Sequence, residues 1–263
     1  MAYLPVHDIP MNSPMLSSER KRQSTADSEM ATCISPFFCE YAPNQHTARP
    51  SKQMKTILLD IGNVLVSFDF DRARNRLISE TVGHPDPIRS LRPLKDQFEV
   101  GAIDSSTFIS EGMDLLHFRG SAQAFRDIWQ EIFDPIDLMW KTVRHAGNSY
   151  RMLLLSNTNE IHRSFLFERF PIFNEFQGGI YSDDVGALKP DAAIFQAATR
   201  EFSLVPSETL FVDDLPENVR AAASLGFKAV QYDKREHLNF LRAADRYGFH
   251  QLVDSIDWEE PNA

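Results

Sequence analysis

One short apolar run constrains this chain more than any other feature: Thr56-Ile57-Leu58-Leu59 leads directly into Asp60. An uninterrupted apolar run of this length is typical of a strand that is buried on both faces, as in a parallel sheet. Open α/β sheets bind their ligands outside the carboxyl ends of the strands, which is where Asp60 would lie. A single aspartate at such a place can also simply cap the next turn, so the downstream sequence has to separate the two interpretations.

The pattern of an apolar run followed by polar residues returns along the chain. Further strands are predicted over residues 151–156, 178–182, 209–214 and 228–232. Helices are predicted between them, over residues 160–167, 192–202 and 217–225. This alternation predicts an α/β fold with a Rossmann-like parallel sheet core and helices on both faces.

A helical block interrupts the alternation between the first two strands. After a loop, helices are expected around residues 72–78, from Ser105 or Ser106 to Leu116, from Ser121 to Ile132, and from Pro135 to Gly147. The sequence His-Pro-Asp-Pro at 84–87 is expected to break the chain, and no clear strand is predicted over 84–150. We therefore assign residues 54–70 and 148–255 to the core and residues 71–147 to an inserted helical cap, placed to act as a lid.

The two ends of the chain differ from this pattern. Residues 1–53 are rich in proline and in small polar residues and show no periodicity, which predicts a disordered extension. Their carboxylates argue against a mitochondrial transit peptide, and they lack the apolar centre of a secretory signal. A docking tail and a start codon mis-assigned ahead of Met54 are alternative interpretations. Residues 256–263 are expected to form a flexible tail.

Composition excludes several classes of protein. The formal net charge of −10 argues against nucleic-acid or acidic-membrane partners, and no apolar run reaches the length of a membrane span. Both cysteines, Cys33 and Cys39, lie ahead of the predicted core, which leaves that core without disulfides, thiolate metal ligands or a cysteine nucleophile. We expect a cytoplasmic protein. The motifs of Walker-type ATPases, dinucleotide-binding folds, α/β-hydrolases and zinc proteases are absent from the sequence.

Polar residues lie at the end of every predicted strand except the last, or in the loop after it, and they should meet at one edge of the sheet. They are Asp60, Ser156, Asn157, Lys189, Asp213 and Asp214. Each alone has an ordinary explanation, such as a helix cap or an exposed cation, but four strand ends with such residues are hard to attribute to chance. Carboxylates are the hard oxygen ligands that Mg²⁺ prefers, and without a cation they would repel one another.

This set of residues predicts a site for a small phosphorylated metabolite. Ser156 and the amides after it could hold phosphate oxygens at a helix N-terminus, and Lys189 could pair with both the phosphate and the nucleophile. Asp60 could then attack phosphorus and form an aspartyl-phosphate that water cleaves.

Four motifs in this order resemble those of the haloacid dehalogenase-like (HAD) hydrolases. They are Asp60-Ile61-Gly62-Asn63-Val64, Leu155-Ser156-Asn157-Thr158-Asn159, Gly186-Ala187-Leu188-Lys189-Pro190, and Val212-Asp213-Asp214 with Asn218. The resemblance covers about residues 54–255, and Phe98 to Asp104 resembles a segment common in the C1 caps of this family. The residues of the first two motifs are most similar to those of the group that includes bacterial α-D-glucose-1-phosphate phosphatases.

The resemblance implies a phosphomonoester substrate, Mg²⁺ as the cofactor, and a role for each matching residue. Asp60 would be the nucleophile and a metal ligand, and Lys189 would support it. The Gly62 carbonyl and Asp214, with Asp213 as a further candidate, would complete the metal ligands. Asn218 would orient them.

Gly62 departs from the pattern of the family's phosphatases, which usually carry there an aspartate that transfers a proton. Such general acid–base help is typically worth about 10²–10⁴-fold in rate. Three interpretations stay open, in this order: a phosphatase that uses water or another side chain as its acid, a phospholigand-binding protein with little turnover, and a metal-independent dehalogenase. Among the histidines, only His162 lies near the predicted phosphate loop.

Overall fold

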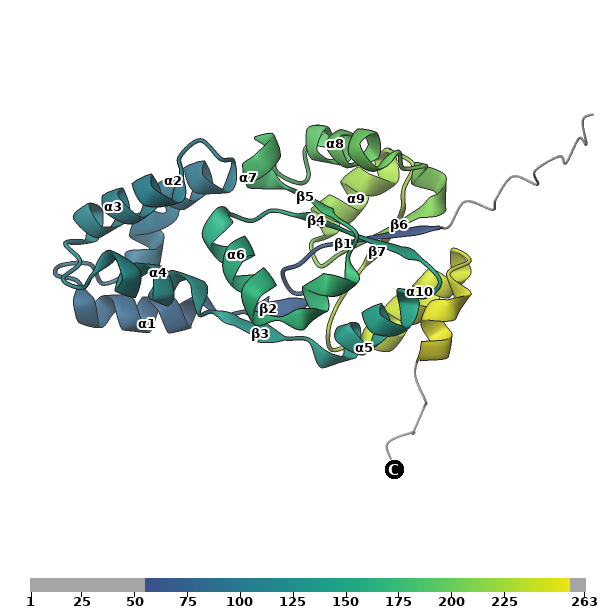
Figure 1. The fold of residues 1–263 in the computed structure, drawn as a ribbon, viewed down its shortest axis with the longest axis horizontal. Helices are drawn as coiled ribbons and strands as arrows, with labels where there is room; N and C mark the ends of the chain where they lie inside the picture. Colours follow the sequence, from purple (N-terminus) through teal and green to yellow (C-terminus); the bar gives the residue numbers. More distant parts are fainter. Residues whose placement is uncertain (1–54, 256–263) are drawn as a thin grey trace, which may run out of the picture. The chain divides into compact units, whose positions relative to one another are not determined.

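The computed structural model describes residues 55–255, and the predictions for residues 1–53 and 256–263 lie outside this range. Its centre is a five-stranded sheet in the order β5-β4-β1-β6-β7 (Figure 1). The strands are β1 (Thr56–Leu59), β4 (Arg151–Ser156), β5 (Gly179–Tyr181), β6 (Thr209–Asp213) and β7 (Lys228–Gln231). All neighbours in this sheet pair in parallel, so the predicted α/β fold with a Rossmann-like parallel sheet is confirmed.

The central position of β1 explains its uninterrupted apolar sequence. Ile57 and Leu59 point to one face of the sheet and Leu58 to the other, as the alternation of a strand requires. Leu59 lies in register with Leu154 of β4 and Val212 of β6. The residues that follow these strands therefore reach the same edge of the sheet.

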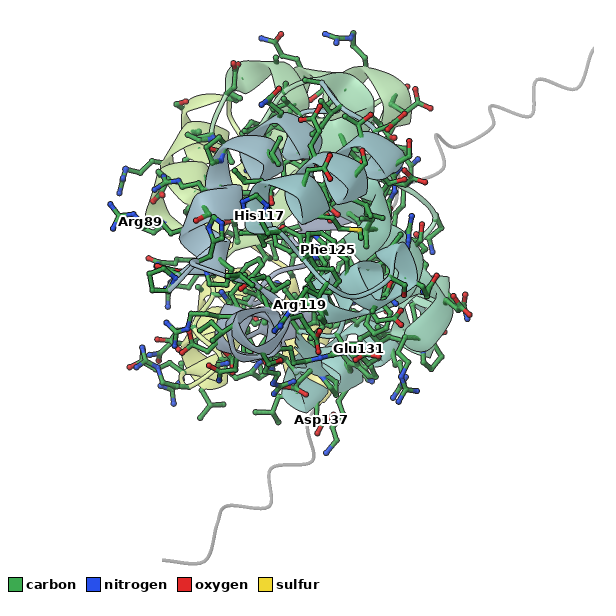
Figure 2. The ribbon with its side chains drawn as sticks, turned by 90° about the vertical axis from the view of Figure 1, so that its left-hand side faces the viewer. Arg89, His117, Arg119, Phe125, Glu131 and Asp137 are labelled. Carbon is green, nitrogen blue, oxygen red and sulfur yellow. The ribbon has the colours of Figure 1, made fainter. Side chains whose placement is uncertain are left out.

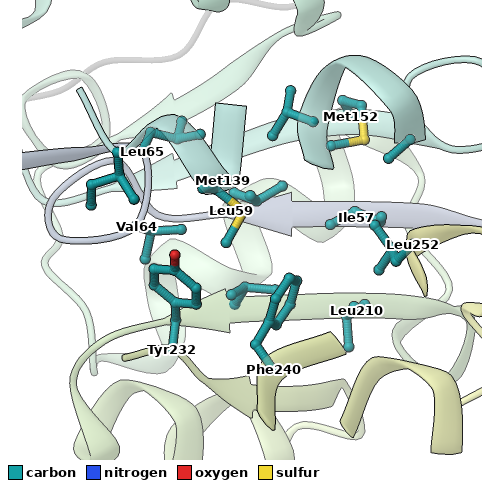
Figure 3. Close-up of a cluster of buried hydrophobic side chains, with 14 of the residues drawn as sticks. Ile57, Leu59, Val64, Leu65, Met139, Met152, Leu210, Tyr232, Phe240 and Leu252 are labelled. Atoms are coloured by element: carbon teal, nitrogen blue, oxygen red, sulfur yellow. The ribbon is translucent and has the colours of Figure 1, made fainter. Parts of the chain in front are cut away.

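Helices cover both faces of the sheet, as Figure 1 shows. On one face, α5 (Asp137–Ala146) and α10 (His237–Arg246) pack on Ile57 and Leu59, and Figure 3 shows Met139 and Phe240 in this cluster. On the other face, α8 (Ala192–Phe202) and α9 (Pro216–Ser224) pack on Leu58. The remaining core helices are α6 (Glu160–Arg169), α7 (Ser182–Val185) and the 3-10 turns Pro171–Glu175, Pro206–Glu208 and His250–Ser255.

Four helices lie between β2 and β3 in the sequence and share a hydrophobic cluster, and we call this unit the cap. They are α1 (Phe70–Glu80), α2 (Pro87–Glu99), α3 (Ser105–Leu116) and α4 (Ala122–Gln130). Phe98 and Phe108 stack inside this cluster with ring centroids 4.7 Å apart. Seen from the cap end in Figure 2, Phe125 lies among the helices, whereas Arg89 points outward.

The sequence at 84–87 breaks the chain between α1 and α2, as predicted, and it also begins the second helix, because Asp86 caps α2 through the amide of Arg89 and Pro87 fits the first turn. Two other local predictions for residues 84–147 are wrong. Asp104, rather than Ser105 or Ser106, caps α3. Pro135 ends a short strand, β3 (Phe133–Pro135), instead of opening a helix.

The strand β3 pairs antiparallel with β2 (Val66–Phe68) in a small sheet at the base of the cap. It was hidden in the sequence because three residues give no readable periodicity. After β3 the chain enters α5, which packs with the core cluster rather than with the cap cluster. The boundaries between core and cap stay a prediction, and this packing favours ending the cap before α5.

Within residues 55–255, no helix is both long and apolar enough to cross a membrane.

Candidate active site

Lys189 lies at the centre of the polar edge of the sheet. Its Nζ atom is 2.7 Å from Asp60 Oδ1 and 2.6 Å from Asp213 Oδ2, and it donates to the Leu155 carbonyl at 2.9 Å. Burial alone would lower the pKa of Lys189, but the charges of the two carboxylates outweigh burial and raise it. The lysine therefore remains a cation between the ends of β1, β4 and β6.

Asp60 directly follows β1 and is buried, and its amide donates to the Val212 carbonyl at 2.9 Å. Burial raises the pKa of Asp60 above its ordinary value, although Lys189 opposes this rise; Asp213 adds to it. A further cation beside Asp60 would favour its ionised form at neutral pH.

Asp213 is fully buried and uses both of its carboxylate oxygens. Oδ2 holds Lys189, whereas Oδ1 accepts from the Leu215 amide and from Asn218 Nδ2, each at 2.9 Å. Asn218 thus makes the contact that an orienting role requires. The other side-chain atom of Asn218, Oδ1, is buried and has no hydrogen-bond partner among the described residues.

Asn63, which the sequence reasoning missed as a site residue, holds Asp214. Its Nδ2 atom donates to Asp214 Oδ2 at 3.0 Å, from a residue in the left-handed region with φ of 53°. Asparagine tolerates this conformation better than most residues. The asparagine could therefore have been picked out from the sequence only if the turn had already been predicted. Burial raises the pKa of Asp214, against the hydrogen bond from Asn63.

The three carboxylates form a candidate metal site. One oxygen atom from each of Asp60, Asp213 and Asp214 lies within 4.8 Å of the others. In the β-bridge between Gly62 and Val66, the Val66 amide donates to the Ile61 carbonyl and the Asn63 amide donates to the Val66 carbonyl. The Gly62 carbonyl takes no part in this bridge. A set made only of oxygen donors fits Mg²⁺ and does not suit a soft metal.

Ser156 ends β4 and Asn157 follows it, at the same edge. Ser156 is buried and donates a hydrogen bond that favours the ionised form of Asp60. The Asn157 side chain instead clamps the backbone of Lys189: Oδ1 accepts from its amide at 2.8 Å and Nδ2 donates to its carbonyl at 3.0 Å. A contact between Asn157 and phosphate would therefore come from the backbone amide.

His162 joins the core to the cap. Its Nε2 atom donates to the Trp129 carbonyl of α4 at 3.0 Å, because a carbonyl can only accept, and Nδ1 accepts from Asn159 at 3.2 Å. The imidazole also stacks on the Trp129 ring, with the two ring centroids 5.5 Å apart. Burial lowers the pKa of His162 to about 4, helped by the charge of Lys95, so the ring is neutral at neutral pH.

A cavity of about 200 Å³ lies between the polar edge and the cap. Its core side includes Gly62, Ser156, Asn157 and His162, and its cap side includes Lys95 and Glu99 of α2 together with the rings of Phe68, Phe70 and Phe133. The sequence pattern did not indicate Lys95 and Glu99, because charged residues four apart on a helix are common on solvated faces.

The sequence model of the haloacid dehalogenase-like hydrolase family matches residues 54–226 of this chain. The chain belongs to this family of hydrolases.

Individual relatives agree with this assignment. The chain is 29% identical over 191 residues to the D-ribitol-5-phosphate phosphatase of Bacteroides thetaiotaomicron, covering 68% of this chain and 91% of that protein. A magnesium complex of a HAD family enzyme from the same organism superimposes with a TM-score of 0.63 and 25% identity, over 72% of this chain and 99% of that one. A predicted HAD-like hydrolase of Porphyromonas gingivalis gives 0.62 and 26%, over 73% and 97%.

Proposed function

We propose that this chain is a Mg²⁺-dependent phosphatase of a small phosphomonoester, such as a sugar phosphate or a similar metabolite. The observation that carries the proposal is the contact of Lys189 with both Asp60 and Asp213, beside a third carboxylate at the same edge. The relative named for its action on ribitol 5-phosphate and the magnesium-bound neighbour support the same class of reaction.

Each residue of the edge has a role in this proposal. Asp60 is the nucleophile and, with Asp214 and the Gly62 carbonyl, a ligand of the metal. Asp213 lies within reach of the metal, but its two oxygens already hold Lys189 and Asn218, so it acts chiefly as the anchor of the lysine. Ser156 and the amide of Asn157 bind phosphate oxygens. Bound Mg²⁺ would supply positive charge that offsets the carboxylates and the phosphate.

The reaction proceeds in two displacements at phosphorus. A carboxylate oxygen of Asp60 forms a bond to phosphorus while the bond from phosphorus to the ester oxygen breaks, and the leaving oxygen takes a proton from water. A second water then attacks phosphorus, which releases inorganic phosphate and restores the Asp60 carboxylate. Lys189 keeps Asp60 in position throughout.

Gly62 favours a second candidate function, a phospholigand-binding protein with little turnover. A glycine has no side chain that could protonate the leaving group, so the first displacement lacks one usual contribution. A metal-independent dehalogenase is the weakest candidate, because attack on a carbon–halogen bond by Asp60 does not need two further carboxylates.

Phosphate release from a panel of sugar, polyol and aryl phosphates, with Mg²⁺ and with a chelator, tests the proposal. We expect release from at least one ester and its loss on chelation. Mg²⁺-dependent binding without release across the panel would favour the binding protein. Release of halide from 2-haloalkanoates without metal would overturn the phosphatase in favour of the dehalogenase.

A further inference from the structure

Lys95 and Glu99 form an ion pair on the cap side of the cavity. Lys95 Nζ lies 2.6 Å from Glu99 Oε2, with side chains that are 25% and 16% exposed. A second pair with the same spacing on α2, Arg92 with Asp96, is 4.0 Å apart and lies in solvent at 80% and 61% exposed. The helix therefore carries one charged pair on its outer surface and directs the other into the cavity opposite Ser156 and Asn157.

An ion pair in this position adds little to stability, because partial desolvation offsets its attraction. It does retain capacity for hydrogen bonds. An ammonium group has three donors, of which Glu99 takes one, and a carboxylate can accept several bonds. The cavity thus presents a donor and an acceptor side by side, on a wall that carries no net charge.

We propose that Lys95 and Glu99 recognise the hydroxyl groups of an uncharged, polyhydroxylated leaving group whose phosphate lies at the polar edge. This inference rests on the proposed phosphatase function. A hydroxyl group both donates and accepts, so it matches the pair, whereas a second phosphate could use only the donors of Lys95, whose charge Glu99 already offsets. The rings of Phe68, Phe70 and Phe133 cover the carbon chain from the sides.

The test compares Glu99→Gln and Lys95→Met with Asp96→Asn, which removes a charge from the same helix outside the cavity. Steady-state kinetics are measured with ribitol 5-phosphate, ribulose 1,5-bisphosphate and p-nitrophenyl phosphate. We expect either cavity variant to raise KM for ribitol 5-phosphate about tenfold or more, since a hydrogen bond to a charged group is lost. Glu99→Gln should lower KM for the bisphosphate, and p-nitrophenyl phosphate should respond to neither.

Failure of this inference differs from failure of the phosphatase proposal. Cavity variants that match Asp96→Asn on all three esters, while the wild type hydrolyses them, would overturn the inference and leave the phosphatase proposal intact.

If the wild type hydrolyses no ester, the phosphatase proposal fails, and calorimetric titration with ribitol 5-phosphate decides the inference. Binding that Lys95→Met weakens and Asp96→Asn preserves would then support the recognition role, and equal or absent binding would overturn it.

Discussion

At the scale of single residues, the site is a set of buried charges that depend on one another. Lys189 neutralises part of the charge of Asp60 and Asp213, and those carboxylates in turn raise the pKa of the lysine against the effect of burial, which alone would lower it. Three asparagines hold these charged groups in place. Asn63 and Asn218 bind the carboxylates of Asp214 and Asp213, and Asn157 binds the backbone of Lys189. A change of a single charge here should therefore affect its neighbours as well.

Replacement of Gly62 tests whether a missing acid limits the rate. A Cβ atom at this position would lie 3.0 Å from Phe68 Cε1, and the Phe68 side chain is half exposed and can move aside. We expect Gly62→Asp to raise kcat for alkyl phosphates, by up to about 10²-fold, because their leaving oxygen needs a proton. The rate with p-nitrophenyl phosphate, whose leaving group is stable as an anion, should change little.

The matched variant is Gly62→Asn, which has the same size and cannot supply the proton. The measurement is the ratio of kcat for an alkyl phosphate to kcat for p-nitrophenyl phosphate. Equal ratios in the two variants would show that proton transfer from position 62 does not limit this enzyme.

At the scale of elements, the cap and the core meet through a few specific contacts. His162 of α6 binds the backbone of α4, and Ile161, the residue beside it, packs in the cap cluster while Leu166 packs in the core cluster. The helix that follows the second motif therefore contacts both the polar edge and the cap. A movement of the cap would therefore displace α6, and with it the predicted phosphate loop that precedes this helix.

The buried His162 should make stability depend on pH. Its folded pKa of about 4 lies below the ordinary value of 6.5, so its contribution is fully present above pH 6.5 and is lost as pH falls toward 4. The full loss amounts to about 3 kcal/mol. We expect the free energy of unfolding in urea to fall more between pH 7 and pH 5 for the wild type than for His162→Gln.

His145→Gln, on the exposed side of α5, is the control for this measurement. It should keep the pH dependence of the wild type. If His162→Gln also keeps it, the histidine is not held neutral in the folded protein.

Gly101, which follows α2, permits a close approach between the cap and α7. A Cβ atom there would lie 2.1 Å from the Asp183 carbonyl oxygen, in a backbone conformation with φ of 66°. Gly83 has a similar φ of 79° but open space around it. Gly83→Ala should cost about 1 kcal/mol of unfolding free energy from backbone strain, and Gly101→Ala should cost clearly more because the cap must move. Equal losses in urea titrations would contradict the close contact.

At the scale of the whole molecule, the sequence was informative where its signals are local and repeated. The five strands of the sheet and the convergence of Asp60, Lys189 and Asp213 follow from apolar runs that end in polar residues. The short strand Phe133–Pro135 and the helix Pro87–Glu99 were missed, because the first is too short for a pattern and the second begins with a proline, a residue that also marks breaks. The sequence could not assign Lys95 and Glu99 to the cavity, since their position there depends on how the cap packs on the core.

The comparison of Asp60→Asn with the wild type tests the central claim most directly. Asparagine keeps the size of the side chain and removes the anion that attacks phosphorus. With Mg²⁺ and the best ester of the panel, we expect kcat to fall by at least about 10³-fold, as for other enzymes that lose their nucleophile. Far-ultraviolet circular dichroism and the urea midpoint establish that the variant is folded. A folded Asp60→Asn protein that releases phosphate at a rate near that of the wild type would contradict this account.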